Sequence, residues 1–212
     1  MSRVVEAWKH LFNAPNKMPR NVGNALRAYG ELQVTAVTVV SLPLIKIIST
    51  VVTRLPGTNL EEPLRHLCMV LHLGRVMMFV EKNQYVEMKI VFKENVDDLL
   101  ARTGAWNETV RLPKRCTLVQ FFSNTERMLT AEGKNMWNYN PRDANCQDFV
   151  ADCLTANGAM TESLRAAIVQ ASVKQGISEG TLGFMKGITN TASMLGQLFG
   201  MGDGTLGGAM PT

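Results

Sequence analysis

Three short apolar segments within residues 64–92 constrain the fold more than any other part of the chain. Gly74 separates the first two segments, and Lys82-Asn83-Gln84 separates the second from the third. Apolar runs of this length between turn residues are typical of β-strands, and connections this short join antiparallel neighbours. We therefore expect a three-stranded antiparallel meander with strands Leu64–Leu73, Arg75–Glu81 and Tyr85–Phe92.

Helical patterns surround this meander. Thr117 begins one helix, because Gln120 three residues later completes a capping box. Gly158 ends another helix, since glycine readily adopts the conformation found after a helix C-terminus. The predicted helices span residues 2–13, 21–31, 94–102, 117–132, 143–157 and 164–173, and a short extended piece spans residues 137–140, before a proline.

The segment Gln33–Val52 is long enough to cross a membrane, since a span needs about 20 residues. Pro43 and Lys46 lie near its middle, however, and a central lysine costs roughly 2.5–3.5 kcal/mol on insertion. We expect the segment to divide into a buried strand, Val34–Val40, and a helix. Ser41 would be the N-cap of that helix, which would continue to about residue 54.

The composition indicates a folded chain of one domain, or one domain with an appendage. The chain has 212 residues, of which 46% are apolar and 19% charged. Its net charge of +4 comes entirely from residues 1–66, which hold eight Lys or Arg against four Asp or Glu. Such a basic region could face an anionic membrane or RNA, although an ordinary solvated surface is the commoner reason. So small a net charge predicts no specific nucleic-acid partner.

The four cysteines are Cys68, Cys116, Cys146 and Cys153, and no two of them form a CxxC pair. We therefore expect no zinc site and no cofactor. The N-terminal residues, MSRVVEAWKHLFN, lack the apolar run of a secretion signal. The expected environment is cytoplasmic, where thiols remain reduced.

Cys146 is the first candidate for chemistry, because it lies in the first turn of a predicted helix. Asp143 or Asn145 would cap that helix. The helix dipole and the free N–H groups, including that of Gln147, would favour a thiolate and hold an oxyanion. Cys146 also lies on an apolar stripe, so a buried structural cysteine is the competing interpretation. For Cys153, farther along the same stripe, we expect only that structural role.

A nucleophilic cysteine needs a base, and His66 and His72 share one face of the first meander strand. Six residues of strand separate them by about 20 Å, so only one can serve Cys146. If Leu73-Gly74 is a two-residue loop, Glu81 lies opposite His66 and can orient its imidazole. A three-residue loop would turn Glu81 to the other face.

Two segments together resemble a known family. LRHLCMVLHLGRVMMFVEKNQYVEM and YNPRDANCQDFVADCLTANG place a strand histidine, an acidic residue and an Asn-Cys helix start in the order found in circularly permuted papain-like thiol hydrolases. The lecithin:retinol acyltransferase-like group, and its viral members most closely, are similar over about residues 30–158. The resemblance implies that Cys146 is the nucleophile and His66 the general base, with Glu81 as the third polar residue. The chain departs from the family at Leu67, where an aromatic residue is common.

The fold expected from the resemblance is α+β, with a small antiparallel sheet packed on the helix that bears the cysteine. Residues 1–32 would form a helical N-terminal region, residues 33–160 the permuted papain-like domain, and residues 161–212 a Gly/Met-rich tail. The implied function is cysteine-dependent acyl transfer on a lipid ester through a thioester, as in a phospholipase or acyltransferase. The expected location is the host cytoplasm or a virion, at the periphery of a membrane.

Two other functions remain open at this stage. The same chemistry would serve a cysteine peptidase or deubiquitinase-like hydrolase. The chain could instead be a non-enzymatic viral structural or accessory protein whose tail binds a capsid or a membrane.

The tail generates a first prediction. Ten of the 17 glycines lie in the last 52 residues, which raises the entropic cost of ordering them. We expect residues 174–212 to contact the core little and to bind lipid or another protein through a short amphipathic helix around residues 194–201. The full chain should therefore co-sediment with liposomes more than a chain ending at Val173, and equal binding would exclude a membrane role for the tail.

Overall fold

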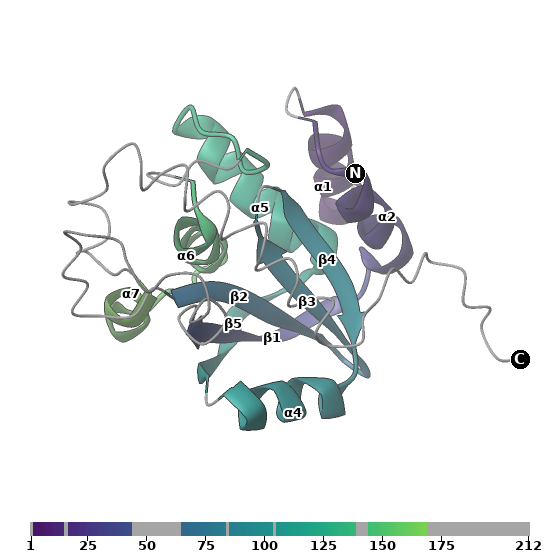
Figure 1. The fold of residues 1–212 in the computed structure, drawn as a ribbon. Coiled ribbons are helices and arrows are strands. Elements are labelled where there is room, and N and C mark those ends of the chain that lie inside the picture. Colours follow the sequence, from purple (N-terminus) through teal and green to yellow (C-terminus); the bar gives the residue numbers. More distant parts are fainter. Residues whose placement is uncertain are drawn as a thin grey trace, which may run out of the picture.

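The computed structural model shows an α+β fold built on one five-stranded antiparallel sheet, with strand order β4-β3-β2-β1-β5 (Figure 1). It describes residues 2–14, 17–43, 65–83, 85–103, 105–138 and 144–168. The strands are β1 (Gln33–Pro43), β2 (Arg65–Leu73), β3 (Val76–Lys82), β4 (Val86–Val91) and β5 (Trp106–Thr117). The helices are α1 (Arg3–Asn13), α2 (Arg20–Tyr29), α4 (Lys93–Thr103), α5 (Leu118–Ala131), α6 (Cys146–Ala156) and α7 (Glu162–Ile168).

The predicted meander is confirmed as β2, β3 and β4, but its first turn is not where the sequence placed it. Leu73 pairs with Val76, so the loop is Gly74-Arg75 and not Leu73-Gly74. Gly74 has a φ of +79°, a conformation that leucine adopts only with strain. The register therefore moves by two residues, which keeps Glu81 on the same face of the sheet as His66.

The strand predicted at Val34–Val40 is confirmed and is longer, since β1 continues to Pro43. The prediction that Ser41 caps a helix is wrong, because Ser41 pairs with Leu67 on one side and Trp106 on the other. Strand pairing on both sides overrides the local capping signal. The rest of that predicted helix lies outside the described residues. Within the described ranges, no helix is both long enough and apolar enough to cross a membrane.

The sequence did not reveal β5, which forms an edge of the sheet beside β1. Its side chains alternate between half-buried and exposed over much of its length, and its sequence, WNETVRLPKRCT, contains few apolar residues. Pro113 and the charged residues after it are common on edge strands, where they oppose pairing with another chain. The same residues conceal a strand from a search for apolar runs.

The predicted helices are confirmed where the structure describes them, with shifted ends. The capping box of Thr117 and Gln120 is present at the start of α5. α6 begins at Cys146, later than predicted, because Asn145 is its N-cap. Gly158, with a φ of +69°, follows its end as expected. Residues 137–138 form a turn and a bend instead of the predicted extended piece.

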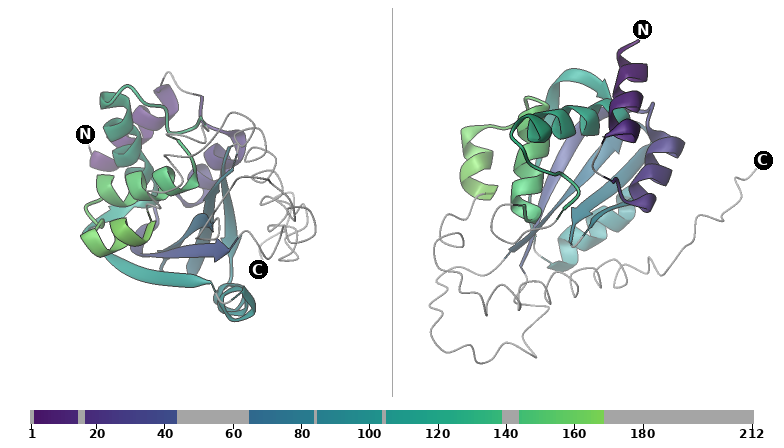
Figure 2. Two further views of the ribbon diagram at one scale, coloured as in Figure 1. Left: turned by 60° about the vertical axis from the view of Figure 1, so that its left-hand side comes forward. Right: turned by 90° about the horizontal axis from the view of Figure 1, so that it is seen from above.

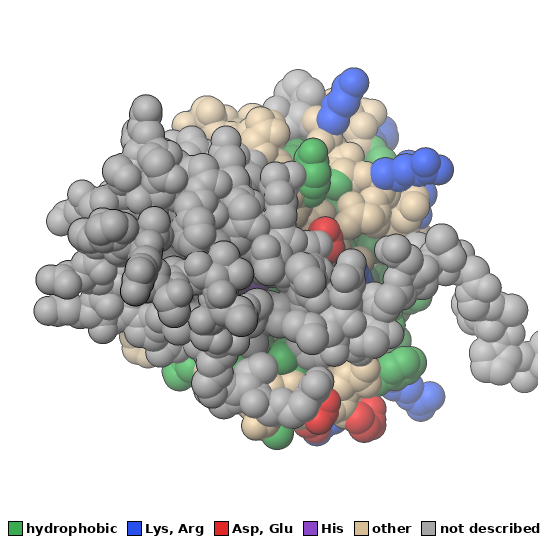
Figure 3. All heavy atoms as spheres, in the orientation of Figure 1, with side chains coloured by type: hydrophobic (Ala, Val, Ile, Leu, Met, Phe, Trp, Pro, Cys, Tyr) green, Lys and Arg blue, Asp and Glu red, His purple; other side chains and the backbone are tan. Residues whose placement is uncertain are grey.

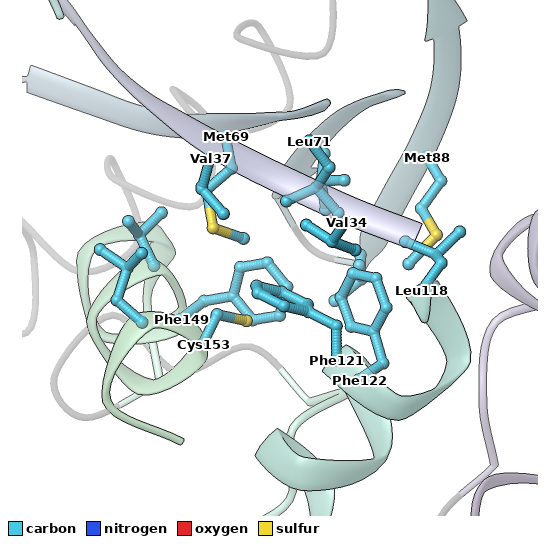
Figure 4. Close-up of a cluster of buried hydrophobic side chains, with 14 of the residues drawn as sticks. Val34, Val37, Met69, Leu71, Met88, Leu118, Phe121, Phe122, Phe149 and Cys153 are labelled. Atoms are coloured by element: carbon cyan, nitrogen blue, oxygen red, sulfur yellow. The ribbon is translucent and has the colours of Figure 1, made fainter. Parts of the chain in front are cut away.

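One apolar core joins the sheet to the helices above it (Figure 4). Figures 1 and 2 show α1, α2, α5 and α6 on one side of the sheet and α4 on the other. Because side chains alternate along a strand, every second residue of β2 enters this core. The core includes Leu11 of α1, Leu26 of α2, Val37 of β1, Leu67, Met69 and Leu71 of β2, Phe121 and Phe122 of α5, and Phe149 and Cys153 of α6.

Candidate functional site

Local capping fixes the position of Cys146 as the first residue of α6. The Asn145 side chain accepts hydrogen bonds from the backbone N–H groups of Gln147, at 2.8 Å, and Asp148, at 3.0 Å. The Asp148 carboxylate accepts from the N–H of Asn145 at 3.4 Å, which completes a capping box. Reciprocal bonds of this kind hold the helix start, and with it the thiol, in one place.

The sheet brings two further predicted residues to this thiol. His66 lies near the start of β2 and Glu81 near the end of β3, and the distance from His66 Nε2 to Glu81 Oε2 is 3.3 Å. Both side chains are 1% exposed. The charge of the Cys146 thiolate acts on the pKa of His66, and that of the imidazolium on the pKa of Cys146, so the imidazole lies near both the thiol and the carboxylate. Cys146, His66 and Glu81 are therefore together in the folded chain, as the sequence predicted.

The electrostatics of the pair favour a thiolate and an imidazolium. Burial by itself raises the pKa of Cys146, but the charge and hydrogen bond of His66, together with the backbone N–H of Leu67, outweigh burial and lower that pKa. Burial by itself lowers the pKa of His66, yet the charge and hydrogen bond of Cys146, and then those of Glu81, raise it above 6.5. The nucleophilic form of a cysteine is the thiolate, so this site activates Cys146.

The other three cysteines lack this activation. Burial raises the pKa of Cys68 well above its ordinary value, and the nearby Glu81 adds to the effect. Burial raises the pKa of Cys116 to about 11 and also raises the pKa of Cys153. Figure 4 shows Cys153 pointing into the apolar core beside Phe149, which agrees with the structural role expected from the sequence. Cys146 is thus the cysteine whose environment favours the reactive form.

The helix start provides fewer oxyanion donors than the sequence suggested. The N–H of Gln147 already donates to the Asn145 side chain, as does that of Asp148. The backbone N–H groups of Leu67 on β2 and of Cys146 itself are the ones that help to lower the pKa of the Cys146 thiol. These two backbone groups lie beside the nucleophile, where a developing oxyanion would form. Asn145 is therefore a helix cap, and Gln147 contributes its backbone to that cap.

The other two histidines have different partners. His10 on α1 pairs with Glu126 on α5 and joins the two helices. His72 lies at the far end of β2 and contacts Thr38 Oγ1 at 2.8 Å. Burial lowers the pKa of His72, which is the reverse of what happens at His66. The choice of His66 as the partner of Cys146 is the one that the geometry supports.

Sequence reasoning missed two buried residues next to Glu81, because it assigned them to a turn. Lys82 is 2% exposed and its Nζ lies 5.7 Å from the centre of the Phe149 ring. Burial lowers the pKa of Lys82 to about 8, against the opposing effect of nearby groups that include Asp152 and Asp148. A run of three polar residues at the end of an apolar strand is the signal that could have indicated a buried polar cluster.

Asn83 is the second missed residue. It is 3% exposed, and neither polar atom of its side chain has a hydrogen-bond partner among the described residues. Continued by two residues beyond the pair Cys68 and Glu81, the β2–β3 register brings Asn83 level with His66. A buried polar group without a partner costs about 1–3 kcal/mol, so the Asn83 amide would gain from a hydrogen bond. At this position the partner could be the imidazole of His66 or a bound ligand. In the described part of the chain, no cluster of ligand residues could hold a metal ion.

Comparisons with known proteins place no family name on this site: no protein-family model, no curated protein and no solved structure matches the chain.

The pKa shifts generate a prediction about the reactivity of Cys146. Its rate of alkylation by iodoacetamide, followed by mass spectrometry, should rise with pH through a midpoint below the ordinary thiol value of about 8.5. In His66→Ala the attraction is lost and burial remains, so the midpoint should move above the ordinary value. His72→Ala is the matched control and should leave the midpoint unchanged. The same midpoint in the wild type and in His66→Ala would contradict the activated pair.

Two cysteines on one helix generate a further prediction. Cys153 is fully buried in the core, so Cys153→Ala should lower the free energy of unfolding by about 1–2 kcal/mol. Cys146→Ala should cost less stability, because burial of its charged form opposes folding, and should remove the fast-reacting thiol. Urea denaturation and alkylation of both variants provide the test. Equal losses of stability and of reactivity in the two variants would instead indicate a structural role for Cys146.

Proposed function

We propose that this chain is a cysteine-dependent acyl-transfer enzyme with a permuted papain-like arrangement. The observation that carries the proposal is the buried pair of His66 and Glu81 beside the start of α6, where the charge of His66 lowers the pKa of Cys146 and that of Cys146 raises the pKa of His66. A nucleophile within hydrogen-bond reach of a base, itself oriented by a third group, is the general arrangement of nucleophilic catalysis. Burial ordinarily raises the pKa of a cysteine, and it does so for Cys68, Cys116 and Cys153.

The order of the elements supports the permuted arrangement. In papain-like proteases the cysteine precedes the histidine by more than a hundred residues. In this chain the histidine strand β2 comes first, the strand β3 with Glu81 follows, and the helix α6 with the cysteine comes last. α6 nevertheless packs against β2 and β3, which is the packing that a permuted arrangement requires.

The proposed reaction has two steps. The Cys146 thiolate attacks the carbonyl carbon of an ester, and the N–H groups of Cys146 and Leu67 stabilise the oxyanion. The carbon–oxygen bond then breaks as the His66 imidazolium transfers its proton to the leaving alcohol, which leaves a thioester on Cys146. Water, or a second hydroxyl acceptor, next loses a proton to His66 and attacks the thioester. The acyl product departs and the thiolate and imidazolium are restored.

A lipid ester is the proposed substrate class. The resemblance to acyltransferase-like enzymes is what suggests an acyl group esterified to a lipid. Figure 3 shows Lys and Arg side chains gathered over the part of the molecule where α1 and α2 lie in Figure 1, and such a surface attracts anionic lipid headgroups. The viral origin, the capsid partner and the location at a membrane in the host cytoplasm or virion rest on the resemblance alone.

Activity-based labelling tests both the mechanism and the substrate class. A thiol-reactive probe with a fatty-acyl tail should label the wild-type chain, and hydrolysis of a phospholipid should release fatty acid. Cys146→Ala should abolish both signals, and His66→Ala should reduce the hydrolysis rate about 100-fold or more, as expected for loss of a general base. Cys68→Ala is the control, since Cys68 is a buried neighbour whose thiol stays protonated.

Three outcomes would decide against parts of this proposal. Labelling that survives in Cys146→Ala would exclude Cys146 as the nucleophile. Labelling by a ubiquitin-derived probe, without any lipid hydrolysis, would favour the peptidase alternative. A fast-reacting Cys146 that turns over neither ester nor peptide substrates would favour a structural or accessory protein.

A further inference from the structure

A cavity of about 600 Å³ lies among α1, α5, the end of β5 and the C-terminal end of α6. Residues 155–158 line it, whereas Cys146 is at the opposite end of α6. At about 1.5 Å per residue, some ten residues of helix separate the two places by about 15 Å. The cavity is therefore distinct from the thiol site.

Cationic side chains from three elements converge on this cavity. Arg3 comes from α1, Lys114 and Arg115 from β5, and Arg127 from α5. Glu6 is the single acidic residue of the lining, so four cations face one anion and the net charge is +3. Among the described residues, none of the four cations forms an ion pair. One carboxylate does not balance four like charges held together, so the cations repel each other and a bound anion would relieve that repulsion.

The floor of the cavity is a fixed polar network centred on Asn157. Its amide nitrogen donates to the backbone carbonyl groups of Phe121, at 3.1 Å, and Cys153, at 2.9 Å. Its amide oxygen accepts from Asn124 Nδ2 at 3.0 Å and from the Cys116 thiol at 3.9 Å. These bonds tie α5, α6 and β5 together below the cations, so the floor is formed before any ligand arrives.

Gln120 adds a directed donor to this lining. Its Oε1 accepts from the backbone N–H of Thr117 at 2.9 Å in the capping box of α5. The amide NH₂ group is therefore the part of Gln120 that remains to contact a ligand. The lining thus offers guanidinium, ammonium and amide donors, which is the set that a phosphate accepts from.

We propose that this cavity binds a phosphate-bearing small molecule of nucleotide size. Its volume lies within the roughly 300–1,000 Å³ typical of small-molecule sites. Planar guanidinium groups match phosphate oxygens in paired hydrogen bonds, and three of the four cations are arginines. The proposal does not rest on the proposed acyl-transfer function, because the two sites share no residue.

Isothermal titration calorimetry of the full chain with ATP and with inorganic phosphate tests the proposal. We expect saturable binding of one ATP per chain, weakened by salt because the contacts are ionic. The variant Arg115→Gln/Arg127→Gln should bind ATP about tenfold more weakly or worse, since it loses two charge-assisted contacts. The control, Lys89→Gln/Lys93→Gln, removes the same charge from β4 and α4 and should bind within about twofold of the wild type.

Further readouts separate the possible outcomes. The alkylation rate of Cys146 should be the same in all of these variants, so the phosphate site and the enzyme proposal can fail independently. Absence of saturable ATP or phosphate binding by the wild type, or equal weakening in the control, would overturn the proposal. So would binding only to vesicles of phosphatidylcholine with phosphatidic acid, or only to RNA, since either would indicate a surface for a membrane or a polymer.

Discussion

The pairing of β2 with β3 is the constraint on which both the core and the candidate site depend. Its register, with Cys68 opposite Glu81, sends alternate residues of β2 into the core beneath α5 and α6 and leaves His66 on the face that Glu81 shares. A shift by one residue would exchange these faces, expose the core residues and separate the imidazole from the carboxylate. The packing of the core and the pairing of His66 with Glu81 therefore require the same register.

Burial at this end of the sheet disfavours the charged groups of the candidate site, but it also strengthens the attractions between them. Desolvation disfavours every charged group there, yet each gains a nearby partner: Cys146 has His66, His66 has Glu81, and the Lys82 ammonium lies close to several acidic groups. In a medium of low polarity these attractions are stronger than at a surface, and a group left unpaired is penalised more heavily. Burial therefore strengthens the attraction between Cys146 and His66, because water cannot screen the two charges.

The sequence predicted the three central site residues because each had a local signal: a strand histidine, an acidic residue one hairpin later, and a cysteine at a helix start. Glu81 was placed on the correct face although its register was wrong by two residues, because a shift of two preserves the face. β5 was missed because its exposed, charged sequence lacks an apolar run, and Asn83 because burial of a polar turn residue depends on tertiary packing. Ser41 shows the same limit, since two neighbouring strands outweigh its capping tendency.

The two ends of α6 carry partial charges of opposite sign. Its N-terminus carries the partial positive charge that favours a thiolate at Cys146, and its C-terminus carries the partial negative charge that attracts cations. The negative partial charge at the C-terminus compensates only part of the positive charge of the cavity lining. A helix end offers about half an elementary charge, and such an interaction contributes roughly 0.3–1 kcal/mol at a surface. Four cations against Glu6 exceed that compensation, so the cavity retains the positive potential that a phosphate would neutralise.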